Sequence, residues 1–111
     1  MSTRAHIRIL EQGKTFMLYH HHDGYPEGIG RDLKHFLHAK KGWWYASEIA
    51  NDLIKQRGIK DDEYEVTTCV HGDEEYIYVI DCDNKTLKCY AHNWDEAYET
   101  SVMRPEIAIP E

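Results

Sequence analysis

The first twenty residues alternate between apolar and polar side chains on either side of Gln12-Gly13. If these two residues form the centre of a tight turn, Ile9 lies opposite Phe16 and Ile7 opposite Leu18, so the apolar partners share one face of a hairpin. The opposite face carries His6, Arg8, Leu10, Thr15, Met17 and Tyr19. That mixed face indicates partial exposure or a second covering layer. The spacing therefore predicts a β-hairpin over residues 5–20.

Helical segments are predicted in the middle of the chain and near its end. Residues 31–40 carry apolar side chains at helical spacing, as does a segment that Ser47 can cap and Gly58 can close. Asn93-Trp94-Asp95-Glu96 matches a capping box, with Asn at the cap and Glu three residues later. We therefore expect two helices between 31 and 58 and a short third helix that starts near Trp94.

Three further strands are predicted between the second and third helices. Segments rich in Val, Ile, Thr and Tyr cover residues 64–70, 76–82 and 87–91. Consecutive strands of this kind favour a meander. With Asn84-Lys85 at the centre of the last turn, Ile80 lies opposite Cys89 and Cys82 opposite Leu87.

The elements follow one another in the order ββααβββα, which excludes regular βαβ alternation. This order predicts an α+β fold, with an antiparallel or mixed β-sheet of about five strands and helices packed on one face. A chain of 111 residues fits one domain. We assign that domain to residues 1–103 and expect a short C-terminal extension over 104–111.

Charge and composition exclude several classes of function. The 13 Lys and Arg residues against 20 Asp and Glu residues give a net charge of −7, which disfavours binding to nucleic-acid phosphates and to anionic membranes. No signal peptide or membrane-spanning run is recognisable. Three cysteines without CxxC spacing indicate neither a disulfide framework nor a zinc ribbon. We expect a cytoplasmic protein without general nucleic-acid binding or membrane attachment, and self-association is left open.

Three consecutive histidines end the second predicted strand. Because strand side chains alternate, His20 and His22 point to one side and His21 to the other. His20 and His22 could offer two imidazole nitrogens to a divalent metal, but a metal site needs one or two more ligands. Asp23, His71, His92 or a cysteine could supply one. The alternative is that the histidines form hydrogen bonds and shape the loop.

The segment after the histidines is rich in turn-forming residues. Asp23 can cap a turn with its side chain, and proline after Tyr25 keeps that residue out of the helical region, which predicts a stiff turn. Gly28 and Gly30 then precede a helix, and free amides there, with Arg31 beside them, could accept a phosphate or carboxylate. The alternative is that loop geometry alone requires the glycines, because the third glycine of a dinucleotide-binding fingerprint is absent.

Aromatic residues form a second candidate surface at Trp43, Trp44 and Tyr45. Trp and Tyr are enriched at the energetic centres of protein interfaces. The competing interpretation is that these side chains pack between the helices.

Residues 19–30, followed by Asp32-Leu33, resemble small bacteriophage and prophage proteins of no established activity, in which a strand ends in H-x-D-G-Y-P-x-G-x-G. The hairpin sequence from Tyr78 to Leu87 is similar to the same type of protein. The resemblance implies a phage-type accessory protein that is expressed in the cytosol of a bacterial host. It brings no catalytic residues or cofactor with it, and it favours a binding role.

The leading hypothesis is a non-enzymatic binding protein. In it the His20–Arg31 loop and the nearby aromatics bind a host protein or a small anionic ligand such as a nucleotide. One alternative is a metal-dependent hydrolase with His20 and His22 as ligands and Asp23 or Glu27 as general base. A second alternative is a structural or dimerisation module whose contact face holds Arg8, Met17, Tyr19, Ile77, Val79 and Tyr90.

Overall fold

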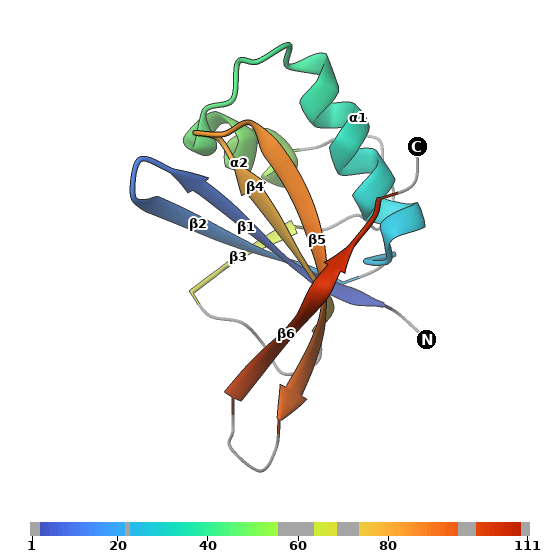
Figure 1. Ribbon diagram of the computed structural model, residues 1–111. Coiled ribbons are helices and arrows are strands. Elements are labelled where there is room, and N and C mark those ends of the chain that lie inside the picture. The colour runs from blue at the N-terminus through green and yellow to red at the C-terminus, as the bar shows by residue number, and fades with distance from the viewer. Residues whose placement is uncertain (1–2, 22, 56–63, 69–73, 96–99, 110–111) are drawn as a thin grey trace.

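Six β-strands form one mixed sheet, and two α-helices pack against it (Figure 1). The computed structural model describes residues 3–21, 23–55, 64–68, 74–95 and 100–109. The sheet order is β3-β2-β1-β4-β5-β6. The strands are β1 (Arg4–Glu11), β2 (Lys14–His20), β3 (Tyr64–Thr67), β4 (Glu74–Asp81), β5 (Thr86–Asp95) and β6 (Thr100–Ile107). The helices are α1 (Arg31–Ala39) and α2 (Ala46–Ile54), and a short helical turn, η1, covers Pro26–Gly30. The predicted α+β class is confirmed, with one strand more than expected.

The N-terminal hairpin has the predicted register. Ile9 pairs with Phe16 and Ile7 with Leu18 across the antiparallel strands β1 and β2. Gln12 and Gly13 both have positive φ, 47° and 79°, as a type I′ turn requires. The other edge of β1 pairs in parallel with β4, so β1 lies in the interior of the sheet.

The predicted meander of three consecutive strands is wrong. Strand β3 pairs with β2, where Val66 lies opposite Leu18, and it occupies the end of the sheet away from β5 and β6. Of the three strands of the predicted meander, β4 and β5 form a hairpin. Sequence proximity favoured pairing between the third and fourth strands, but β1 occupies the edge of β4 that a meander would give to β3.

The register of the β4–β5 hairpin also differs from the prediction, because its turn holds four residues in place of two. Ile80 lies opposite Leu87, not Cys89. The carboxylate of Asp81 builds the longer turn by accepting hydrogen bonds from the backbone and the side-chain amide of Asn84, at 3.1 and 2.8 Å. These bonds lower the pKa of Asp81. Since the shift is two residues, the side chains stay on their predicted faces.

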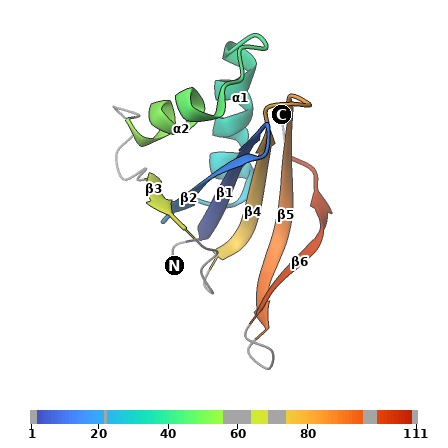
Figure 2. The ribbon, with the colours of Figure 1, turned by 90° about the vertical axis from the view of Figure 1, so that its left-hand side faces the viewer.

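The predicted third helix is also wrong. Strand β5 continues through Asn93 and Trp94 to Asp95, which pairs with Thr100 of β6. A capping box contributes only about 1 kcal/mol, so extended pairing with a neighbouring strand can override it. Strand β6 reaches Ile107, so the sheet includes part of the segment that we expected to be an extension. In Figures 1 and 2 the β5–β6 hairpin projects beyond the other strands.

Both central helices lie where the sequence predicts them, but the cap of α2 differs. Tyr45 precedes the helix in an extended conformation, and the helix starts at Ala46 without a side-chain cap from its own segment. The amide of Ala46 instead donates to Oε1 of Glu11 on β1, at 2.8 Å. Ser47 therefore does not cap α2, because the strand beneath supplies the acceptor. Gly58, the predicted end of this helix, lies outside the described residues.

The core lies between the helices and one face of the sheet. It consists of Ala5, Ile7, Ile9, Leu18, Ile29, Leu33, Leu37, Ala46, Ile49, Ala50, Leu53, Tyr64, Tyr78, Ile80, Cys82 and Cys89. The opposite face is also covered in part, since His6, Tyr19 and Ile77 are buried there. Among the described residues, no helix is long and apolar enough to cross a membrane.

Candidate functional site

The segment from Asp23 to Gly30 packs tightly on the N-terminal strand. Gly24 is buried, and its amide donates to the carbonyl oxygen of Thr3 at 2.9 Å. A Cβ atom at position 24 would lie 2.9 Å from the Cβ of Ala5 and 2.9 Å from the carbonyl oxygen of Thr3. Close packing against β1 therefore requires glycine at this position.

Tyr78 of β4 also contacts this segment, from the side of the sheet. Its hydroxyl donates to the carbonyl oxygen of Gly24 at 2.7 Å, and its ring would lie 3.1 Å from a Cβ atom on Gly30. The side chain is fully buried, and burial raises the pKa of the Tyr78 phenol far above its ordinary value. Two of the motif glycines thus serve contacts with the sheet.

The amides that could have bound an anion are used within the segment. The amide of Gly28 donates to the carbonyl oxygen of Tyr25 at 2.9 Å, and the amide of Ile29 donates to the carbonyl oxygen of Asp23 at 2.8 Å. The amide of Arg31 donates to the carbonyl oxygens of Gly28 and Pro26. Asp23 has a φ of +51° and also accepts a hydrogen bond from the exposed hydroxyl of Tyr25 at 3.2 Å. The geometry of the segment therefore favours a structural role for the glycines over an anion site.

The histidines do not converge in the described part of the chain. His20 is buried, and its ring lies 4.5 Å from that of Tyr64. His21 is half-buried, with Nε2 3.0 Å from Oε1 of Glu65. His22 and His71 lie outside the described residues. Within the ranges that the structure describes, no three His, Cys, Asp or Glu side chains lie close enough together to hold a metal ion.

A buried pair of polar side chains lies near the N-terminal ends of the two central strands, β1 and β4. Nδ1 of His6 is 3.1 Å from Oε2 of Glu74, and both side chains are fully buried. The backbone carbonyl of Glu74 accepts a hydrogen bond from Nδ1 of His92 at 2.6 Å, which fixes the tautomer of that ring. The sequence analysis did not single out this pair, because the register of β4 against β1 is needed to bring the two residues together.

The three consecutive aromatics have different environments. Trp43 and Tyr45 are 65% and 46% exposed, and their ring centroids are 6.2 Å apart. Trp44 is half-buried and packs against the core. The aromatic partner surface predicted from the sequence is therefore reduced to Trp43 and Tyr45.

The proposed dimerisation face is only partly accessible. Tyr19 and Ile77 are 6% and 1% exposed. The other four members, Arg8, Met17, Val79 and Tyr90, are half-buried. Two of the six members therefore have little surface to offer to a second copy of the chain.

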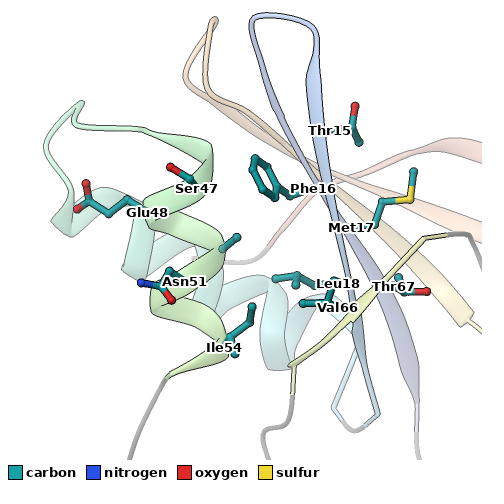
Figure 3. Close-up of a pocket in the computed structure, with 11 residues that line it drawn as sticks. Thr15, Phe16, Met17, Leu18, Ser47, Glu48, Asn51, Ile54, Val66 and Thr67 are labelled. Carbon is teal, nitrogen blue, oxygen red and sulfur yellow. The ribbon is translucent and has the colours of Figure 1, made fainter.

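An apolar groove separates α2 from the sheet edge formed by β2 and β3 (Figure 3). Its volume is about 710 Å³. Phe16 and Leu18 reach into it from β2, Val66 from β3, and Ile54 from the last turn of α2 (Figure 3). Glu48 points away from the strands (Figure 3). Six of the eleven lining residues are apolar, and the polar ones are Thr15, Ser47, Glu48, Asn51 and Thr67.

Three of the large apolar side chains exposed to solvent belong to this groove. Phe16 is 37% exposed, Ile54 44% and Val66 71%. Alternation along β3 places Val66 and the buried Tyr64 on the face that points to the helices. Sequence reasoning missed the groove because the predicted meander put β3 beside β4, far from Phe16. An available signal was Ile54, the last residue of the apolar stripe of α2.

Comparisons with protein-family models, with curated proteins and with solved structures give no match for this chain. Arguments about its function therefore rest on its own residues.

Proposed function

We propose that this chain is a non-enzymatic binding protein of the phage accessory type, and that the groove between α2 and β2–β3 binds an apolar segment of a protein partner. The observation that carries the proposal is the grouping of exposed Phe16, Ile54 and Val66 around one cavity of about 710 Å³. Single exposed apolar residues are ordinary, whereas a group around a cavity marks interaction sites. Exposed Trp43 and Tyr45, just before α2, could add aromatic anchors.

Charge favours a basic partner. The chain carries −7 at pH 7. On the exposed side of α2, Glu48 and Asp52 both form ion pairs with Lys40. A segment with apolar anchors flanked by Lys or Arg would be attracted by this potential and could place its apolar side chains in the groove. In the phage setting implied by the motif, such a partner is a host protein.

The described residues give no observation in favour of the hydrolase alternative. His20 is engaged with Tyr64, and the position of His22 is not described. The glycine-rich segment contributes to the fold by the contacts given above, so we place the recognition surface at the groove.

The experiment compares two candidate surfaces with one kind of substitution. Val66→Lys introduces a charge into the groove, and Tyr25→Lys does the same on the exposed His20–Arg31 loop. Both side chains are exposed, at 71% and 38%, so both variants should keep the fold. Tagged wild type and both variants are used to isolate partners from a bacterial lysate, and dissociation constants are then measured with the purified partner.

The proposal predicts that Val66→Lys weakens binding about 30-fold, the effect of losing one interface anchor of about 2 kcal/mol, and that Tyr25→Lys binds like wild type. A partner lost only with Tyr25→Lys would move the surface back to the loop. Equal binding by all three proteins, or no specific partner, would contradict the groove assignment.

A further inference from the structure

A second cavity, of about 370 Å³, lies at the C-terminal end of α1. Leu37 and His38 of α1, Lys41, Gly42 and Trp44 of the following segment, and Lys85 of the β4–β5 turn line it. Figures 1 and 2 show this turn at the same end of the molecule as the chain that joins α1 to α2. The cavity therefore combines two segments that are far apart in the sequence, and it is separate from the groove at β3.

The lining of this cavity has the opposite charge to the protein as a whole. Three of its seven described lining residues, His38, Lys41 and Lys85, are basic and none is acidic, although the chain has a net charge of −7. In the described part of the chain, neither Lys41 nor Lys85 forms an ion pair, whereas the neighbouring Lys40 turns away to Glu48 and Asp52. The negative end of the α1 dipole explains a cation at Lys41 but not the approach of Lys85 from another element.

The backbone holds both lysines in an uncommon conformation. Lys41 has a φ of 52° and Lys85 a φ of 54°, in the left-handed region where Gly and Asn are favoured. Lys41 follows the C-terminal end of α1 and Lys85 lies in the β4–β5 turn, so turn geometry accounts for both conformations, as it does at Gln12. Gly42, at a φ of 90°, lies next to the side chain of Lys85, since Cε of Lys85 would be 3.8 Å from a Cβ atom at that position, an ordinary contact distance.

Trp44 supplies the apolar part of the same site. Its indole is half-buried, packs on the core and lines the cavity together with Leu37. An adjoining cavity of about 190 Å³ shares Leu37, His38 and Trp44 and extends toward Lys34 and Leu87. A cavity lined by an indole and by two lysines that form no ion pair with the described residues suits a ligand that has both a flat ring and an anionic group.

We infer that this cavity binds a small aromatic anion of the nucleoside monophosphate type, with the ring against Trp44 and the phosphate between Lys41 and Lys85. The cavity volume is within the range of small-molecule sites. The site does not include the His20–Arg31 segment, in which the amides of Gly24, Gly28, Ile29 and Arg31 already donate to backbone carbonyls. It is also independent of the protein-binding groove.

The test is a titration of the untagged protein with adenosine monophosphate, followed by calorimetry and by the amide signals of an NMR spectrum. Adenosine and inorganic phosphate are the two partial probes. Lys41→Gln and Lys85→Gln remove the proposed phosphate contacts. Lys88→Gln is the matched control, because Lys88 is exposed on β5 and does not line the cavity, and because its substitution makes the same change in charge.

The expected result is binding of adenosine monophosphate that each cavity variant weakens about tenfold, the size of one charge-assisted hydrogen bond, while Lys88→Gln changes it less than about twofold. Each partial probe should bind at least about tenfold more weakly than the nucleotide. The amide signals of Gly42 and Lys85 should shift. Inorganic phosphate that binds as tightly as the nucleotide, shifts centred on Arg31, or no binding at millimolar nucleotide would each overturn the inference. Val66→Lys serves to separate the two proposals, since it should leave nucleotide binding unchanged.

Discussion

Replacing Tyr78 by Phe tests whether one buried hydrogen bond anchors the glycine-rich segment to the sheet. The hydroxyl of Tyr78 donates to the carbonyl oxygen of Gly24 at 2.7 Å, and the side chain has no exposed surface. The substitution removes one oxygen atom and leaves the ring in place. It therefore separates the contacts of the hydroxyl, which also include the thiol of Cys89, from the packing of the ring.

The magnitude follows from the burial of both groups. Removing the donor leaves the carbonyl of Gly24 without this bond inside the core, which costs about 1–3 kcal/mol of the free energy of unfolding. In a domain of this size, about 1 kcal/mol lowers the melting temperature by about 4 °C. We expect Tyr78→Phe to melt about 4–12 °C below wild type.

Thermal denaturation by circular dichroism measures this loss, and Tyr25→Phe is the control. The hydroxyl of Tyr25 is exposed and 3.2 Å from Asp23, in the same segment, so its removal should cost less than about 0.5 kcal/mol. Hydrogen exchange adds a local readout, because the amides of Gly28 and Ile29 should exchange faster only in Tyr78→Phe. A melting temperature within about 2 °C of wild type, or equal losses in both variants, would refute the anchoring argument.

Three further predictions concern the motif and the buried thiols. Gly28→Ala should lower the free energy of unfolding by about 1–3 kcal/mol in chemical denaturation, since its Cβ would clash with the carbonyl oxygen of Asp23; an unchanged midpoint would show that the segment relaxes freely. Burial raises the pKa of Cys82 and of Cys89 from 9.0 to about 11. In a Cys69→Ser variant both thiols should therefore react with a disulfide reagent only after unfolding. Rapid reaction of the native protein would contradict their burial. The same shifts mean that the stability these thiols contribute is complete below pH 9 and is lost as pH rises toward about 11, because the unfolded thiols ionise first; a flat stability profile across this window would contradict the shifts.

Local sequence patterns predicted the positions of the strands and helices better than they predicted which strands pair in the sheet. The Gln12-Gly13 turn fixes the β1–β2 register within a few residues, and that register is confirmed. The β4–β5 register is off by two residues because Asp81 and Asn84 build a longer turn. A signal for this turn was present, since an Asp three residues before an Asn is typical of a side-chain-closed turn.

Pairings between distant segments could not be read from the sequence. The parallel contact between β1 and β4 joins residues about seventy positions apart, and no local preference specifies it. The groove depends on the position of β3 beside β2, and the second cavity depends on the approach of Lys85 to Gly42. For the same reason the glycines of the motif could be recognised as special, while their partners, Thr3 and Tyr78, could not.

The parallel pairing of β1 with β4 also determines the order in which the chain can fold. Strand β2 begins three residues after β1 ends, whereas β4 begins at Glu74. During synthesis the first strand therefore keeps one edge of unpaired amides until about two thirds of the chain has left the ribosome, and such an edge can pair with another nascent chain. The β1–β2, β4–β5 and β5–β6 hairpins can close early because their strands are adjacent in the sequence, but the long connection between β1 and β4 has to be ordered before these two strands pair. The pairing of β1 with β4 is therefore expected to form last and to limit the folding rate.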